Sequence, residues 1–129
     1  MAAAHTALLF DADPATIDSV RDLLPWKQVR VERTDDADAA IDCLKQTSYC
    51  GLILDLSLTN SRDVLLHMSE QHIGIPIIVI SSKFPDSIRD MPIAPAIKLV
   101  LAKPLDPSLL ASIIVGLCGI AGSTISRPR

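Results

Sequence analysis

One stretch of this chain, Gly51 to Leu58 (GLILDLSL), constrains the fold more than any other. Leu52, Ile53 and Leu54 are continuously apolar, and the run ends in a single carboxylate, Asp55. A run without polar alternation is typical of a strand that is covered on both faces, as in the middle of a parallel sheet. Parallel-sheet proteins place their chemistry just beyond the carboxyl ends of such strands. We therefore expect a functional role for Asp55, although a lone Asp after a strand more commonly caps the next turn.

The order of strand followed by helix repeats five times along the chain. Such repetition with short connections predicts an α/β fold, in which a five-stranded parallel sheet carries helices on both faces. Val29 and Val31 alternate with charged residues, so the second strand should lie near an edge of the sheet. The expected strands lie near 7–10, 29–32, 52–55, 75–80 and 97–101, and the expected helices near 14–24, 36–44, 64–72, 86–91 and 107–121.

The length of 129 residues fits one domain, for which hydrophobic residues at 49% and charged residues at 21% predict a packed core. We place a single domain at 1–122 and a flexible tail or truncated linker at 123–129. The net charge of −3 gives no general attraction to nucleic acid or acidic membranes. The longest apolar stretch, Leu109 to Gly122, falls short of the ~20 residues that cross a bilayer. These features predict a cytoplasmic protein without nucleic-acid or membrane partners.

The three cysteines, Cys43, Cys50 and Cys118, form no C-x-x-C pair. The sequence therefore suggests neither a disulfide framework nor a zinc site, and we expect reduced, mostly buried thiols.

Polar residues follow four of the predicted strands. Asp11 and Asp13 follow the first strand, Asp55 the third, Ser81 the fourth and Lys103 the fifth. Carboxylates at two strand ends can hold a hard divalent cation such as Mg²⁺, which prefers oxygen ligands. A carboxylate can attack a phosphoryl group, while a Lys balances its charge and a Ser hydroxyl donates to its oxygens. Together these groups suffice for reversible phosphorylation of an Asp.

With these residues the chain resembles the receiver domain of two-component response regulators over nearly its full length. The matching pieces are LLFDADP, LILDLSL, IPIIVISS and LAKPLDP, in the family's order and spacing. The resemblance implies a flavodoxin-like three-layer sandwich with strand order 2-1-3-4-5. It implies Asp55 as the phosphoacceptor, Ser81 as the hydroxyl that closes on the phosphoryl group, and Lys103 as its charge partner, joined to Pro104 by a cis bond. It also implies that a Mg²⁺ ion is held by Asp11, Asp55 and the Ser57 backbone.

Several positions depart from the pattern of the family. The family usually has two adjacent acids after the first strand, but Ala12 stands at the second, so we expect weakened Mg²⁺ binding. Asp13 is a further candidate ligand, although an Asp directly before Pro14 is favoured as a helix N-cap. Thr59 replaces the usual Pro after the phosphoacceptor, and Val100 replaces an aromatic residue that commonly moves with the hydroxyl.

Three functions are open at this point. The first is a receiver that is not an enzyme and takes a phosphoryl group on Asp55 from a histidine kinase or phosphotransfer protein. The second is a pseudo-receiver, a binding module that does not switch by phosphorylation, which Ala12 and Val100 favour. The third is a haloacid-dehalogenase-like phosphatase, which FDADPAT resembles, but there Asp55 would have no role. Kinase, output and oligomeric state cannot be deduced.

The predicted last helix is more apolar than one buried face requires. We expect Leu109, Ile113 and Leu117 to line the core, with Leu110 and Ile114 among the residues that widen the stripe beyond it. The helix is therefore also a candidate interface for a second copy or an output domain.

Overall fold

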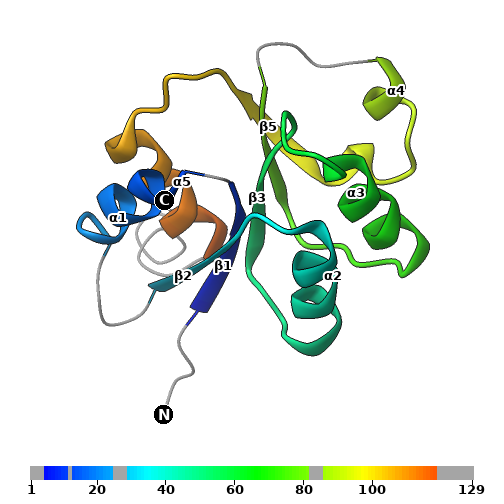
Figure 1. The fold of residues 1–129 in the computed structure, drawn as a ribbon, viewed down its shortest axis with the longest axis horizontal. Coiled ribbons are helices and arrows are strands. Elements are labelled where there is room, and N and C mark those ends of the chain that lie inside the picture. The colour runs from blue at the N-terminus through cyan, green and yellow to red at the C-terminus, as the bar shows by residue number, and fades with distance from the viewer. Residues whose placement is uncertain (1–4, 12, 25–28, 82–85, 119–129) are drawn as a thin grey trace, which may run out of the picture.

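The computed structural model describes residues 5–11, 13–24, 29–81 and 86–118 and has one five-stranded parallel sheet in the order β2-β1-β3-β4-β5. This confirms the predicted fold class and strand order (Figure 1). The predicted tail at 123–129 lies outside the described residues. The strands are β1 (His5–Phe10), β2 (Val29–Thr34), β3 (Gly51–Asp55), β4 (Ile77–Ile80) and β5 (Ile97–Leu101). The helices are α1 (Pro14–Arg21), α2 (Ala37–Gln46), α3 (Ser61–Glu70), α4 (Asp86–Arg89), a 3-10 turn (Ala94–Ala96) and α5 (Pro107–Cys118).

Aspartates begin the first two helices, as their sequence positions predict. The Asp13 carboxylate accepts a hydrogen bond from the Ala15 backbone N–H at 3.0 Å, and that of Asp36 accepts one from the Ala39 N–H at 3.1 Å. These bonds satisfy N–H groups that a helix start leaves without intrahelical partners. α1 ends at Arg21, before the predicted limit near Pro25.

The sheet separates two apolar layers. α1 and α5 cover one face, and α2, α3 and α4 cover the other (Figure 1). All residues of β3 and β4 are buried, which confirms the prediction drawn from their continuous apolar runs. β2 alternates buried and exposed residues at one edge of the sheet, also as predicted. β5 forms the other edge and leaves Leu99 44% and Val100 39% exposed.

The predicted orientation of the last helix is wrong in part, because Ile113 and Leu117 pack against the core as expected but Leu109 does not line it. Leu110, Ala111 and Ile114 of α5 are buried, whereas Leu109 is 50% exposed. An amphipathic pattern fixes which side of a helix faces the core, but α5 is apolar nearly all round, so its pattern left that orientation undetermined. Leu117 lies against β3, where a Cβ on Gly51 would come within 2.7 Å of its side chain. Gly51 thus allows the close approach of α5.

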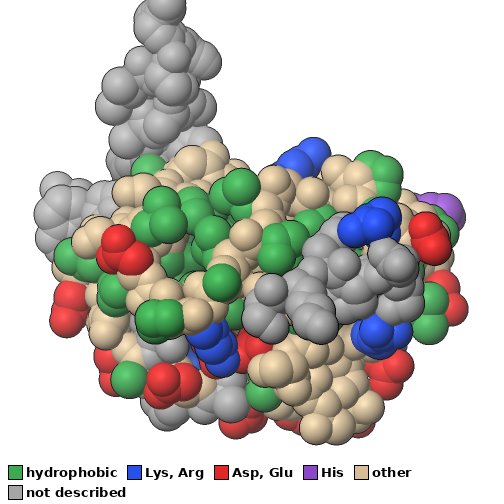
Figure 2. All heavy atoms as spheres, turned by 90° about the horizontal axis from the view of Figure 1, so that it is seen from above, with side chains coloured by type: hydrophobic (Ala, Val, Ile, Leu, Met, Phe, Trp, Pro, Cys, Tyr) green, Lys and Arg blue, Asp and Glu red, His purple; other side chains and the backbone are tan. Residues whose placement is uncertain are grey.

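The expectation that all thiols are reduced is wrong for Cys50, which is disulfide-bonded, while Cys43 is a free thiol. Spacing in the sequence identifies C-x-x-C pairs but carries no signal for other pairings. Among the described residues, no helix has the length and apolar character that a membrane crossing needs. Figure 2, a view from above Figure 1, shows basic and acidic side chains intermixed on that face rather than a field of one sign.

Candidate functional site

The structure places Asp55 at the end of the central strand β3, with the residue 2% exposed. β3 lies between β1 and β4, and the register pairs Leu54 with Phe10 and Asp55 with Ile80. The polar residues that follow β1 and β4 therefore come to the same edge of the sheet as Asp55. This is the convergence that the order of strands and helices predicted.

Two residues donate hydrogen bonds to the Asp55 carboxylate, one to each of its oxygens. The Lys103 ammonium donates to Oδ2 at 2.7 Å. Ser57 donates to Oδ1 twice, from its hydroxyl at 2.7 Å and from its backbone N–H at 3.0 Å. The bond to the Ser57 N–H closes the turn after β3, so Asp55 also fills the turn-capping role that a lone Asp commonly has.

These contacts determine the charge states of both groups. Burial alone would raise the pKa of Asp55, but hydrogen bonds from Lys103 and Ser57 outweigh it and hold that pKa below its ordinary value. The hydrogen bond to Asp55 raises the pKa of Lys103 against the opposing effect of desolvation, and the charges of Asp11 and Asp13 add to the increase. At neutral pH the site therefore holds a carboxylate and an ammonium ion.

Asp11 is the second buried acid of this edge, at 1% exposure. Its Oδ1 accepts a hydrogen bond from the Asp13 N–H at 3.1 Å, whereas its Oδ2 is buried and has no hydrogen-bond partner. The Arg33 guanidinium donates to the Asp11 main-chain carbonyl at 2.7 Å, which fixes the end of β1 against β2. A buried carboxylate oxygen without a partner is costly unless a cation or water satisfies it.

Asp13, the other acid after β1, is not buried at this edge of the sheet as Asp11 is. Its carboxylate is exposed and caps α1. It lines a neighbouring hollow of about 310 Å³ together with Lys103, rather than the hollow over Asp55. Ala12, the residue predicted to weaken Mg²⁺ binding, lies outside the described residues.

An open hollow of about 390 Å³ lies over Asp55, and Ser81 and Lys103 are among its lining residues. Ser81 follows β4, and its backbone N–H donates to the Leu101 carbonyl at 2.8 Å, which joins the ends of β4 and β5. The Lys103–Pro104 bond is cis, as the resemblance implied. The structure thus brings the predicted residues Asp55, Ser81 and Lys103 to one hollow. Its full lining is Asp55, Leu56, Ser57, Arg62, Ile80, Ser81 and Lys103.

The donor set suits a hard cation only in part. Within the described ranges, no cluster of three or more His, Cys, Asp or Glu side chains is placed to hold a metal ion. Asp11 and Asp55 are two buried carboxylates at the ends of the neighbouring strands β1 and β3. The Asp11 Oδ2, which has no hydrogen-bond partner, is the kind of ligand that Mg²⁺ takes. Because Mg²⁺ in proteins often keeps several waters and binds one or two carboxylates, these residues fit a weakly held ion.

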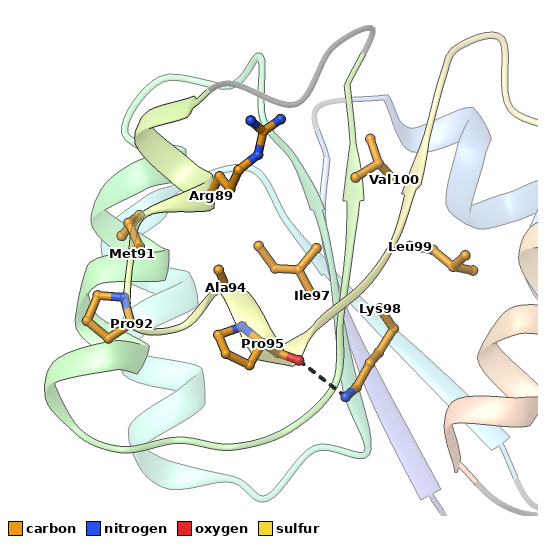
Figure 3. A pocket seen from close by; sticks show the side chains of 9 residues that line it. All are labelled: Arg89, Met91, Pro92, Ala94, Pro95, Ile97, Lys98, Leu99 and Val100. Carbon is orange, nitrogen blue, oxygen red and sulfur yellow. Dashed lines mark hydrogen bonds between the residues drawn. The ribbon is translucent and has the colours of Figure 1, made fainter.

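A further hollow lies away from Asp55. It has a volume of about 560 Å³ and lies along β5 beside α4 and the 3-10 turn, where Ile97 and Val100 face it (Figure 3). Arg89 and Lys98 are its charged lining residues, and Lys98 donates to the Pro95 carbonyl at 3.3 Å. No carboxylate is among its lining residues, so its size does not make it the site of Asp55 chemistry.

Sequence reasoning missed two side chains of the Asp55 hollow. Ser57 was expected to act through its backbone alone, but its hydroxyl also bonds Asp55, a contact that the two-residue spacing could have suggested. Arg62 was not predicted because the apolar pattern of α3 starts at Val64, whereas the helix begins at Ser61. The apolar spacing that predicts a helix locates its ends less well than its centre. The start of α3 is also not marked by a side-chain hydrogen bond from its N-cap residue, Asn60.

Comparison with solved structures places this fold among receiver domains. A signal receiver domain from Vibrio parahaemolyticus aligns with a TM-score of 0.75 at 16% identity, over 98% of this chain and 100% of that one. The receiver domain of a sensor histidine kinase from Pseudomonas aeruginosa, with a magnesium ion in its active-site cleft, aligns with a TM-score of 0.66 at 20% identity, over 92% and 100%. A phosphorylated cyanobacterial phytochrome response regulator gives 0.69 at 21%, over 98% and 100%.

No family model and no curated protein sequence matches the chain. The likeness is therefore one of fold, at identities below those that carry residue roles. The chain has the fold of a response-regulator receiver domain, and the roles of its residues rest on their own geometry.

Proposed function

We propose that this chain is a receiver domain that accepts a phosphoryl group on Asp55. The observation that carries the proposal is the 2.7 Å contact between Lys103 and Asp55 at the end of β3, beneath an open hollow. Burial would raise the pKa of Asp55, but the hydrogen bonds from Lys103 and Ser57 lower it further than burial raises it. The carboxylate is therefore ionised at neutral pH and can act as a nucleophile. The ammonium lies where it would meet an oxygen of a phosphoryl group on that carboxylate.

The transfer would proceed as a displacement at phosphorus. A carboxylate oxygen of Asp55 forms the new bond to phosphorus, while the bond from phosphorus to the donor atom breaks and the electron pair stays with the donor. When the donor is a phosphohistidine of a histidine kinase or phosphotransfer protein, its ring nitrogen then takes a proton. Lys103 balances the added charge, and the Ser81 hydroxyl is the candidate donor to a phosphoryl oxygen. Hydrolysis by water would return the Asp55 carboxylate and release inorganic phosphate.

Asp11, Asp55 and the Ser57 backbone carbonyl are the groups that would hold a Mg²⁺ ion. When bound, the ion would supply positive charge to the phosphoryl oxygens. The buried, unpartnered Asp11 Oδ2 supports this assignment. Comparing Mg²⁺ titrations of the wild type and Ala12→Asp tests whether Ala12 weakens binding, as we propose. Equal affinities would contradict that part of the proposal.

A pseudo-receiver is the second candidate function, and the orientation of Asp13 favours it. The Asp13 carboxylate caps α1 and lines a different hollow. It therefore does not supply a third acidic ligand for Mg²⁺ beside Asp11 and Asp55. In that case the domain would act as a binding module, with a partner at α5 or along β5. The phosphatase alternative is weaker, because the Lys contacts Asp55 rather than the Asp11 that such an enzyme would use as its nucleophile.

Intact mass tests the main proposal. The protein is incubated with a small phosphoryl donor and Mg²⁺, with Asp55→Asn as control. A gain of one phosphoryl group by the wild type alone supports a working receiver. No gain in folded protein would support the pseudo-receiver instead. Turnover of a generic phosphomonoester that depends on Asp11 would revive the phosphatase and contradict our view that the chain is not an enzyme.

A further inference from the structure

The Asp55 hollow contains a second cation that the proposed chemistry has not used. Arg62, in the first turn of α3, lines the hollow together with Asp55, Ser81 and Lys103. Arg62 is exposed, and no hydrogen bond or ion pair to another described residue engages its guanidinium. Lys103, by contrast, is already bonded to Asp55. Arg62 is thus a second cation lining the hollow over Asp55, and its donors are not engaged by another described residue.

The turn between β3 and α3 sets the position of Arg62. The Ser61 hydroxyl, in a residue that is 3% exposed, donates to the Leu56 carbonyl at 2.9 Å, and the Ser61 N–H donates to the Leu58 carbonyl at 3.2 Å. Asn60 takes a left-handed conformation with φ 64, which turns the chain into the helix. These contacts hold the first turn of α3 against the end of β3. The backbone of Arg62 is therefore positioned at the hollow by hydrogen bonds within this turn.

The charges of the hollow change when Asp55 gains a phosphoryl group. The free site pairs one carboxylate with the Lys103 ammonium. An aspartyl phosphate presents three peripheral oxygens and an additional negative charge, more than one ammonium can engage. A guanidinium offers N–H donors in a planar fork that matches two phosphoryl oxygens. Arg62 has the chemistry and the location to supply the second cationic contact.

We propose that Arg62 is a further phosphoryl-binding residue of this site, which contacts the group on Asp55 from the α3 side of the hollow. The inference rests on the proposed phosphorylation of Asp55. Loss of this contact should weaken binding of the phosphoryl group without affecting the fold, because Arg62 is exposed and unbonded in the free protein. We expect Arg62→Gln to raise by about 10-fold the concentration of small phosphoryl donor needed for half-maximal modification.

The experiment compares four proteins: the wild type, Arg62→Gln, Arg62→Lys and Arg30→Gln. Arg30→Gln is the matched control, since Arg30 is an exposed arginine on edge strand β2, separated from β3 by β1. Intact mass gives the donor dependence, and thermal stabilisation by beryllofluoride, a phosphoryl mimic, gives a binding affinity that does not depend on turnover. We expect Arg62→Gln to lose about 10-fold in both, Arg62→Lys to lose less, and Arg30→Gln to match the wild type.

The outcomes separate this inference from the function on which it rests. If the wild type gains a phosphoryl group and Arg62→Gln behaves like Arg30→Gln in both measurements, Arg62 is an ordinary solvated arginine and the inference is overturned. If the wild type neither gains a phosphoryl group nor responds to beryllofluoride, phosphorylation of Asp55 itself is wrong, and the inference falls with it.

Discussion

The contact between Lys103 and Asp55 predicts a stability change that depends on pH. Lys103→Met removes the ammonium but keeps a side chain of similar length. The Asp55 side chain is 3% exposed, so the variant leaves a buried carboxylate with only its two bonds from Ser57. Removing one partner of a fully buried pair costs about 3–5 kcal/mol, whereas fully exposed pairs are worth about 0–1 kcal/mol. Because the Lys103 side chain is 52% exposed, we expect a loss of about 1–3 kcal/mol near neutral pH.

The sign of the pH dependence follows from the two pKa shifts. Burial opposes ionisation of Asp55, but the bonds from Lys103 and Ser57 lower its pKa from the ordinary value of 3.8. The stability that this gives is therefore present above that value and is lost as pH falls through the lower pKa of the folded state. The pKa of Lys103 is raised above 10.5, first by its bond to Asp55, so its contribution is present below that value and is lost as pH rises through the raised pKa. The cost of Lys103→Met should be greatest between these limits.

Urea denaturation followed by far-UV circular dichroism measures the effect at about pH 7 and about pH 3. Lys98→Met is the matched control. Lys98 is an exposed lysine of β5, the strand that precedes Lys103, and among the described residues it bonds only a backbone carbonyl. A double-mutant cycle with Asp55→Asn isolates the pair, since Lys103→Met should cost little once the carboxylate is absent. If Lys103→Met costs no more than Lys98→Met, or costs the same at both pH values, the assignment of an ion pair to this site is refuted.

Four further variants test other parts of the structure in the same denaturation assay. Leu110→Ala should cost about 2–5 kcal/mol and Leu109→Ala less than about 1 kcal/mol, and equal costs would contradict the orientation of α5. Tyr49→Phe should cost about 1 kcal/mol because it removes the 2.6 Å bond from the buried phenol to Glu32, and no cost would deny that bond a stabilising role. Asp36→Ala should cost about 1 kcal/mol through loss of the α2 N-cap, and an unchanged stability would mean that this cap is replaceable.

The fold could be predicted because its main signals are local. The apolar runs of β3 and β4 predicted buried strands, and Asp13 and one of Asp35 and Asp36 were predicted to start helices, since burial on both faces and capping each leave a pattern within a few residues. The orientation of α5 could not be predicted in this way. Its residues are apolar on most sides, so its packing against α1, β1 and β3 decides that Leu110 is buried and Leu109 is not.

The sequence predicted which residues of the candidate site lie together at the strand ends, but it did not predict the contacts between their side chains. The register of parallel strands brings Asp11, Asp55 and Ser81 to one edge, and the sequence predicted that much. The bond from the Ser57 hydroxyl and the position of Arg62 depend on the conformation of the turn after β3, in which Asn60 is left-handed. Thr59 stands where the family pattern usually has Pro, so neither pattern nor resemblance could specify the shape of this turn.

The two acids after β1 show why similar side chains at one edge can have different roles. Asp11 is 1% exposed and keeps Oδ2 without a partner, whereas Asp13, two residues further, is exposed and bonds the first turn of α1. Rotating Asp13 toward the site would leave the Ala15 N–H without its cap, at a cost of about 1 kcal/mol. Any Mg²⁺ affinity gained from Asp13 would be reduced by that amount. Ala12→Asp adds an acid without removing the Asp13 cap, and this is why that substitution, rather than a change at Asp13, is the informative one.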